Sequence, residues 1–375
     1  MVEPLTAKSG KLTAPSFPGR IPSIDGLRAI SVLLVVFGHA CSTYGAPLAL
    51  DRRLFTSIGN VGVRFFFLIS GFLITTLLLK ETDANETINL RHFYIRRALR
   101  ILPAFWFYLS VIYISSLCGW VDLNYHMVSQ KSADSPYPEL LRALTFTSNY
   151  QRDYNWFLNH LWSLSVEEQF YVLWPGLLCV LGIAKSLRFG ISVLFVVPLI
   201  RAGMYLFQHI PLIMLSREFQ AVADALATGC VLSLLYNRLF TNRRLVKLVS
   251  GFEGFIIGGA ALFLGYALAL ISPPLAYILG QTVSNLGAAL IIASSIHSPQ
   301  NVIGRMLNSR ALVGLGAFSY SLYLWQEPFM FFRSHTWPQS FPQNILLAFA
   351  MALLSYFLVE RPFLRNKARW RADQP

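Results

Sequence analysis

The sequence predicts an all-α polytopic membrane protein, with about ten transmembrane helices around a polar intramembrane cavity and both termini in the cytoplasm. Its 375 residues are 55% hydrophobic and only 13% charged, whereas soluble domains are about 25% charged. The mean hydropathy is +0.51, and the apolar residues form long runs rather than helical stripes. Ionisable residues nevertheless interrupt several of these runs, which indicates a polar interior.

Apolar runs of about 20 residues, the length at which a helix crosses a bilayer, predict the spans. The ten expected spans are 27–45, 58–79, 101–120, 159–182, 189–209, 219–236, 248–271, 274–295, 310–332 and 343–360. With the N-terminus inside, most of the 31 Lys and Arg residues fall on the cytoplasmic side, as the positive-inside rule requires. The net charge of +13 reflects this bias and attraction to anionic lipid, so it implies no nucleic-acid partner.

The expected organisation is a cytoplasmic N-terminal tail at 1–22, a membrane domain at 23–362 and a basic cytoplasmic tail at 363–375. The first 20 residues are polar, and the first apolar run is long enough to span a membrane. We therefore expect no cleavable signal peptide, and a multi-pass location in the cytoplasmic (inner) membrane.

The first span, "GLRAISVLLVVFGHA", carries Arg28 near its start and His39 eleven residues later. At about 100° per residue, this separation is three full turns plus about 20°. The two side chains therefore lie on nearly the same stripe of the helix. Such a stripe suggests a polar path through the membrane.

Other spans place ionisable residues at related depths. Glu167 and Glu168 in span 159–182 are expected roughly 12–14 Å from the outer edge, level with His39. The other charged residues expected near this depth are Arg64, Arg201, Asp224 and Glu327. Because buried charges are costly unless they face a polar space or one another, we expect a shared cavity open toward the outer leaflet.

A basic cluster, "RHFYIRRALRILPAFW", precedes and enters the third span. Arg97 and Arg100 are three residues apart, so they share a helix face. Guanidinium groups bind phosphate through paired hydrogen bonds, and the cluster suits a polyphosphorylated soluble ligand. Basic residues beside a span also serve topology and headgroup contact, and residue type alone does not separate the two roles.

Two further patterns indicate packing rather than chemistry. The pair Ser70 and Gly71 in "LISGF" lacks the first glycine and the strand of a serine-nucleophile elbow, so we expect it to permit close helix packing. The four cysteines lie in or beside apolar segments without metal-ligand spacing, so no metal site and no required disulfide are expected. They are Cys41, Cys118, Cys179 and Cys230.

Five segments in order resemble the integral-membrane acyltransferase family 3: "DGLRAISVLLVVFGHA", "FFLISGFLITTLLLKE", "FYIRRALRILPAFW", "LWSLSVEEQFYVLWP" and "FSYSLYLW". The resemblance covers nearly the whole chain. It implies an O-acyltransferase, usually an O-acetyltransferase, that modifies bacterial cell-surface glycans and related glycolipids. The implied partners are acyl-coenzyme A, with acetyl-CoA as donor substrate, a glycan or glycolipid acceptor, and membrane lipid.

By this resemblance, Arg28 and His39 match the active-site pair of the family, and Arg97 and Arg100 match its donor-binding motif. Glu168, with its neighbour Glu167, matches a buried acidic position, and we expect the carboxylate to orient His39 as a general base or acyl relay. The chain departs from the family after the ninth-span "YLW". Many members have His there, whereas this chain has Gln326.

The alternative function is a glycolipid or polysaccharide transporter or flippase, in which the polar residues would form a proton relay. The sequence shows no internal repeat, and it carries the RxxR cluster, and both features favour transfer. A purely structural scaffold would leave the buried charges unexplained.

Overall fold

A computed structural model describes residues 14–15, 20–47, 52–131 and 135–366, and most of both predicted tails lies outside these ranges. The described residues form helices and loops, with no β-strand among them. The longer helices are α1 (Pro22–Ala40), α2 (Arg52–Asn85), α3 (Leu90–Leu117), α6 (Leu161–Leu206), α7 (Phe219–Leu239), α9 (Glu253–Ile271), α11 (Gln281–His297) and α15 (Gln343–Ser355).

Shorter helices connect the long ones. The short α-helices are α4 (Tyr137–Leu144), α5 (Trp156–Asn159), α8 (Arg243–Ser250), α10 (Pro273–Leu275), α12 (Val302–Leu307), α13 (Arg310–Ala317), α14 (Ser319–Trp325) and α16 (Arg361–Asn366). The remaining single turns are η1 (Ser148–Tyr150), η2 (Leu212–Ser216), η3 (Ala276–Gly280), η4 (Glu327–Phe329), η5 (Trp337–Gln339) and η6 (Tyr356–Glu360).

Eight helical segments of the described chain are long and apolar enough to cross a membrane. One of them, Trp156–Leu206, covers two predicted spans. Gly182 (φ 71°) interrupts the helix between them. The predicted span 310–332 is wrong as a single helix: the chain leaves helical geometry at Phe318, and the α-helix ends again at Trp325, where the 3-10 turn η4 follows, giving α13, α14 and η4.

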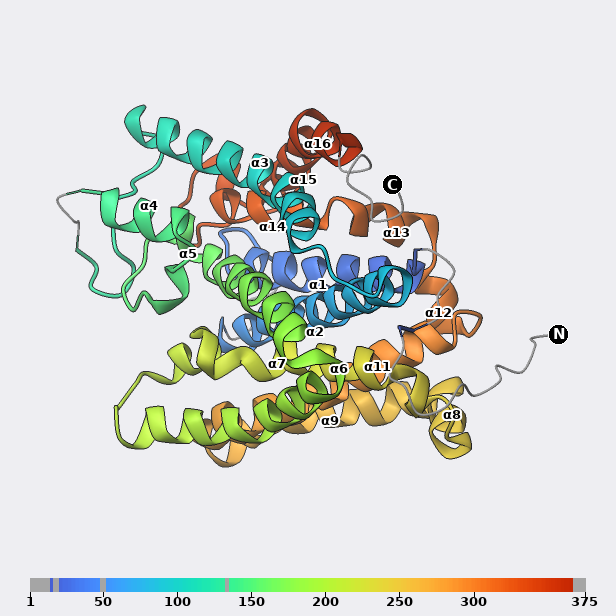
Figure 1. Ribbon diagram of the computed structural model, residues 1–375. Helices are drawn as coiled ribbons and strands as arrows, with labels where there is room; N and C mark the ends of the chain where they lie inside the picture. Colours follow the sequence, from blue (N-terminus) through green and yellow to red (C-terminus); the bar gives the residue numbers. More distant parts are fainter. Residues whose placement is uncertain (1–13, 16–19, 48–51, 132–134, 367–375) are drawn as a thin grey trace.

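Helix α1 lies in the middle of the bundle, beside α2 (Figure 1). The bundle packs through small residues, as expected for "LISGF": a Cβ on Gly71 of α2 would lie 2.1 Å from the carbonyl oxygen of Leu226 in α7. Gly26 similarly lets α1 approach Leu307 at the end of α12. Close backbone contact of this kind is the usual substitute for hydrophobic collapse between membrane helices.

The outer surface of the bundle is apolar. Phe195 of α6, with Phe263 and Leu270 of α9, has more than two thirds of its side chain exposed. Exposed apolar faces on long helices match a lipid environment and would be a liability in water.

Candidate active site

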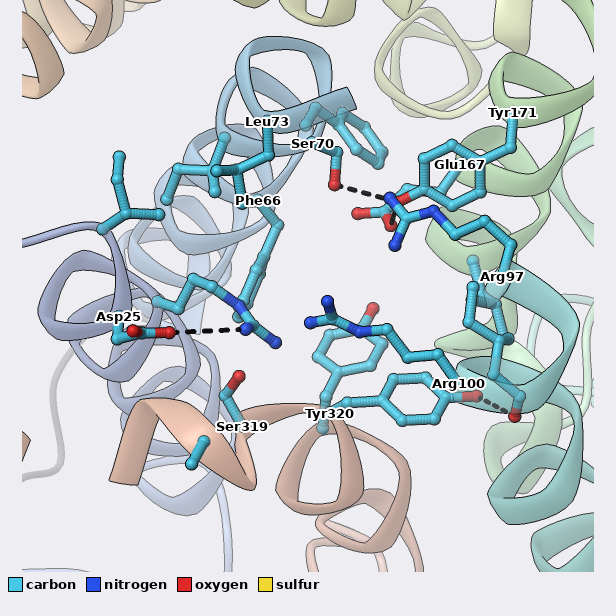
Figure 2. A pocket seen from close by; sticks show the side chains of 18 of the residues that line it. Asp25, Phe66, Ser70, Leu73, Arg97, Arg100, Glu167, Tyr171, Ser319 and Tyr320 are labelled. Carbon is cyan, nitrogen blue, oxygen red and sulfur yellow. Dashed lines mark hydrogen bonds and ion pairs between the residues drawn. The ribbon is translucent and has the colours of Figure 1, made fainter. Parts of the chain in front are cut away.

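A cavity of about 520 Å³ lies between α1, α2, α3, α6 and the α14–α16 region (Figure 2). Arg97 and Arg100 of α3 point into it, facing Asp25 of α1 on the opposite wall. Arg28 also lines the cavity. The structure therefore brings together the three arginines that the sequence analysis had assigned to two separate sites.

Arg97 is held over an aromatic platform. Its guanidinium carbon lies 4.0 Å from the centre of the Tyr171 ring, a cation–π arrangement. The Tyr171 hydroxyl lies 2.5 Å from Glu167 Oε2 and 3.0 Å from Ser70 Oγ, which anchors the ring. The buried Nε of Arg97 has no hydrogen-bond partner in the described part of the chain. A buried, unsatisfied cationic donor beside a cavity fits an anionic ligand.

The charge balance of the cavity is positive. Five basic side chains line it, namely Arg20, Arg28, Lys80, Arg97 and Arg100, against the three acidic side chains Asp25, Glu167 and Glu360.

The three acids of the cavity have other partners. Asp25 pairs with Arg20, and its other oxygen lies 3.8 Å from Arg28. Glu360 accepts a hydrogen bond from Ser321 at 2.8 Å. With Glu167 engaged by Tyr171, Arg97 and Arg100 form no ion pair with a carboxylate in the described residues.

His39 lies in the last turn of α1, outside the lining of this cavity. Its Nδ1 is 2.7 Å from Gln326 Oε1, and Gln326 Nε2 donates to Glu327 Oε2 at 2.9 Å. The Trp156 ring packs edge-on against the imidazole, with ring centres 5.8 Å apart. The His39 side chain remains 28% exposed, so it stays accessible.

Sequence reasoning missed His160. It precedes α6, is almost fully buried, and places Nδ1 3.5 Å from Glu327 Oε2. A histidine at the mouth of an apolar span, in "NHLWSL", was the available signal. Glu327 thus faces two histidines that are distant in sequence.

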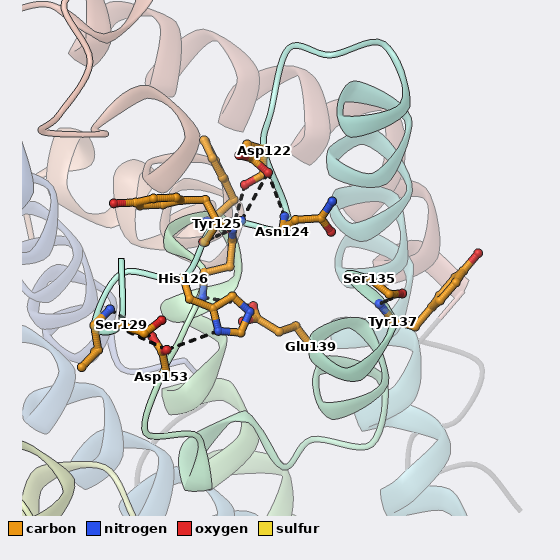
Figure 3. A network of polar contacts seen from close by, with 12 residues as sticks. Asp122, Asn124, Tyr125, His126, Ser129, Ser135, Tyr137, Glu139 and Asp153 are labelled. Atoms are coloured by element: carbon orange, nitrogen blue, oxygen red, sulfur yellow. Dashed lines mark hydrogen bonds and ion pairs between the residues drawn. The ribbon is translucent and has the colours of Figure 1, made fainter. Parts of the chain in front are cut away.

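A polar network, whose Asp122, Tyr125, His126, Glu139 and Asp153 are seen in Figure 3, lies in the loops before Trp156. Asn155 caps α5 by accepting from the backbone N–H of Phe157, and its Nδ2 donates to the carbonyl oxygens of Asp122 and Tyr125. The backbone N–H of Asn155 donates to Glu139 at 3.1 Å. Because Trp156 follows directly, this network fixes the ring that packs on His39.

His126 joins the two acids of the network, at 3.1 Å from Glu139 and 3.5 Å from Asp153. Burial raises the pKa of Glu139, and His126 opposes that rise. Partial burial also disfavours the Asp153 carboxylate, but hydrogen bonds from Ser129 and Val128 outweigh it and lower the pKa of Asp153. The loop is therefore held partly by charge.

Glu167 and Glu168 do not lie beside His39, contrary to the expected depth. Glu167 lines the arginine cavity, and the charged groups that act on Glu168 are Arg97 and Glu167. The depth was misjudged because α1 begins at Pro22 and places His39 near its end. His160, directly before α6, is at the level of His39, and Glu167 lies about 10 Å further along the chain.

The other buried charges form separate clusters rather than one shared cavity. Arg201 of α6 pairs with Asp224 of α7 at 2.8 Å, and Gln281 of α11 accepts from the same guanidinium. Arg64 of α2 donates to Asn285 of α11 at 3.1 Å. These groups pair with one another between helices, which is the other way in which a membrane interior tolerates charge.

Tyr323 joins the cavity to the surroundings of His39. Tyr323 lines the cavity and donates to the backbone oxygen of His160 at 3.0 Å. Phe66, on the cavity wall in Figure 2, packs edge-on against the Tyr323 ring. Tyr323 therefore belongs both to the lining of the arginine cavity and to the surroundings of His160, whereas His39 lies outside that lining.

The comparisons with known proteins identify the family. The acyltransferase domain family matches residues 21–360. The chain belongs to this acyltransferase family. The match runs from the start of α1 to η6, so it includes both the arginine cavity and the His39 cluster, and the resemblance read from the five sequence segments is confirmed.

Two relatives indicate the chemistry known within the acyltransferase family. The O-acetyltransferase OatA of Staphylococcus aureus (strain NCTC 8325 / PS 47) is 29% identical over 375 residues, covering 93% of this chain and 58% of the relative. A putative O-acetyltransferase of S. aureus (strain COL) is 31% identical over 376 residues, covering 94% of this chain and 59% of the relative. The chain thus spans less than two thirds of these curated relatives. No solved structure matches it.

Proposed function

We propose that the protein transfers an acetyl group from acetyl-CoA to a hydroxyl of a cell-surface polysaccharide, lipid-linked oligosaccharide or related glycolipid, at the cytoplasmic membrane. The acyltransferase family and its O-acetyltransferase relatives support the reaction class. The observation that carries the proposal is that the central helix α1 places Arg28 in the arginine cavity and an accessible imidazole, His39, near its other end.

Arg28, Arg97 and Arg100 are proposed to bind the phosphates of the donor. Coenzyme A carries a pyrophosphate and a 3′-phosphate, and guanidinium groups bind such oxygens with paired, charge-assisted hydrogen bonds. Glu167 acts through Tyr171, by anchoring the ring under Arg97. Glu168, whose Oε1 is buried without a hydrogen-bond partner in the described chain, belongs to this donor end.

The donor arm must then reach His39, about 16 Å along α1 from Arg28. Tyr323 lines the cavity and bonds to His160, and Phe66 packs against its ring. We expect these rings to shift when the thioester arm enters. The acceptor hydroxyl approaches from the opposite side, where the His39 ring is accessible.

His39 acts as the general base. Its neutral imidazole takes the proton of the acceptor hydroxyl while the oxygen attacks the thioester carbonyl carbon. The carbon–sulfur bond breaks, coenzyme A leaves as the thiolate, and the imidazolium returns its proton to the sulfur. The products are the acetyl ester and free coenzyme A, and histidine is regenerated. Base catalysis of this type typically contributes about 10²–10⁴-fold.

The test is acetyl transfer in membranes that contain equal amounts of wild-type protein and His39→Gln. The Gln side chain is polar but lacks useful basicity, so we expect transfer to be abolished while coenzyme A binding persists. Glycan mass spectrometry distinguishes the alternative function: an acetyl increment per sugar supports transfer, whereas internal accumulation of unmodified glycan supports a flippase. Near-normal acetylation by His39→Gln contradicts the proposal.

A further inference from the structure

The two ring nitrogens of His39 have different environments. Nδ1 faces Gln326 Oε1 at 2.7 Å. Nε2 has no hydrogen-bond partner among the described residues, on a ring that is 28% exposed. A neutral imidazole carries its single proton on one nitrogen only, so the group that faces Nδ1 decides which nitrogen can accept a proton.

The chemistry of the next residue decides the orientation of the Gln326 amide. Glu327 Oε2 lies 2.9 Å from Gln326 Nε2. Gln326 turns its NH₂ toward this carboxyl oxygen, which accepts the hydrogen bond. The amide oxygen then faces His39, and this oxygen can only accept. Nδ1 must therefore carry the imidazole proton, and the lone pair lies on Nε2.

The surrounding structure keeps the three side chains in this arrangement. Gln326 and Glu327 are completely buried at the end of α14. Trp156 donates its ring N–H to the backbone oxygen of Glu327 at 2.9 Å and packs on His39. The end of α14 and Trp156, which are far apart in sequence, thus both hold His39, Gln326 and Glu327 in place. Fixed partners of this kind are what determine the tautomer of a working histidine.

We propose that Gln326 and Glu327 are positioning residues that hold His39 in the Nδ1–H tautomer, so that Nε2 is the atom that removes the acceptor proton. This inference rests on the proposed function and assigns the role that the sequence analysis had given to Glu168. When Nε2 gains the proton, Nδ1–H keeps its bond to Gln326. The Glu327 carboxylate, 3.8 Å from Nδ1, then stabilises the imidazolium.

The test compares Gln326→Leu with Gln326→Glu. Leucine has a similar volume and no acceptor, whereas glutamate keeps an acceptor oxygen toward Nδ1. In purified full-length protein labelled with ¹⁵N-histidine, the His39 signals are assigned by their loss in His39→Gln. At a pH where the ring is neutral, we expect a protonated Nδ1 and a bare Nε2 in the wild type and in Gln326→Glu. Gln326→Leu should give a mixture of tautomers.

Turnover provides the second measurement. Gln326→Leu should lower kcat about 10- to 100-fold, by analogy with the groups that orient metal-bound histidines, with unchanged affinity for coenzyme A. Gln326→Glu should recover several-fold of that loss. The control is Gln208→Leu, which changes an exposed glutamine beyond the end of α6 and should retain wild-type values.

A wild-type spectrum with the proton on Nε2, or wild-type kcat in Gln326→Leu, overturns the positioning role. If Gln326→Leu does not fold, the wild-type and Gln326→Glu spectra still decide. The two proposals fail differently. If His39→Gln retains acetyl transfer, His39 is not the general base and the proposed function fails. If His39→Gln loses transfer while Gln326→Leu keeps normal turnover, only the positioning role of Gln326 and Glu327 fails.

Discussion

Replacing Arg97 with Gln should weaken donor binding without unfolding the protein. The guanidinium lies in a cavity with five basic and three acidic side chains, and its buried Nε lacks a protein partner in the described chain. A charge-assisted hydrogen bond is worth about 1.5–3 kcal/mol, so loss of one contact should raise the Kd for coenzyme A about 10- to 150-fold. Isothermal titration of the full chain in detergent measures this directly.

The geometry of the Arg97 site adds two internal checks. Arg97→Lys should recover the affinity only in part, because an ammonium cannot reproduce the planar fork or its stacking on Tyr171. The matched control is Arg91→Gln, on the same helix but exposed and outside the cavity lining. A Kd for Arg97→Gln within about twofold of the Arg91→Gln value would refute phosphate binding by the cavity.

Three further predictions concern the Tyr171 ring under Arg97, the close packing of α2 on α7 at Gly71, and the polar loop that contains Asp153. Tyr171→Ala should weaken coenzyme A binding several-fold, by loss of a cation–π contact of about 0.5–2 kcal/mol, whereas Tyr171→Phe should keep most of the affinity in the same titration. Gly71→Ala should lower the unfolding free energy by about 1–3 kcal/mol, since its Cβ meets a backbone oxygen; thermal unfolding should show no such loss for Gly259→Ala, where the space is open. Asp153 has a lowered pKa in the folded protein, so its stabilisation of the loop is present above about pH 4 and lost as the pH falls through the lowered pKa. The hydrogen-exchange protection factor of the Val128 amide should fall in that acidic range, and Asp153→Ala should show the same loss of protection at neutral pH.

Features set by one helix were predictable from the sequence. The angular relation of Arg28 and His39 follows from eleven residues of regular helix, and Arg97 and Arg100 share a face for the same reason. Gly71 as a packing position followed from residue size, and the structure confirms it. These inferences need no knowledge of how neighbouring helices are placed.

Features set between helices were not predictable. The level of a residue depends on where its helix begins, and Asn155 and Pro22 set those starts through capping and a fixed φ. Apolar run length does not report such shifts. The depth inferred from the apolar runs therefore placed Glu168 beside His39, whereas in the structure His160 occupies that level. The break after Trp325 also had no apolar signature, although it brings the next two residues against His39.

The separation of the two sites gives the mechanism a kinetic signature. The arginines line a cavity together with Phe66 and Tyr323, and His39 lies outside that lining. A donor-end change such as Arg97→Gln should therefore raise the KM for acetyl-CoA and leave the pH dependence of kcat unaltered. A change in the residues that position His39, such as Gln326→Leu, should lower kcat and leave donor affinity unaltered. If Arg97→Gln or Gln326→Leu changed the KM for acetyl-CoA and kcat equally, donor binding and proton transfer would not be separated. The donor phosphates and the imidazole would then share one site.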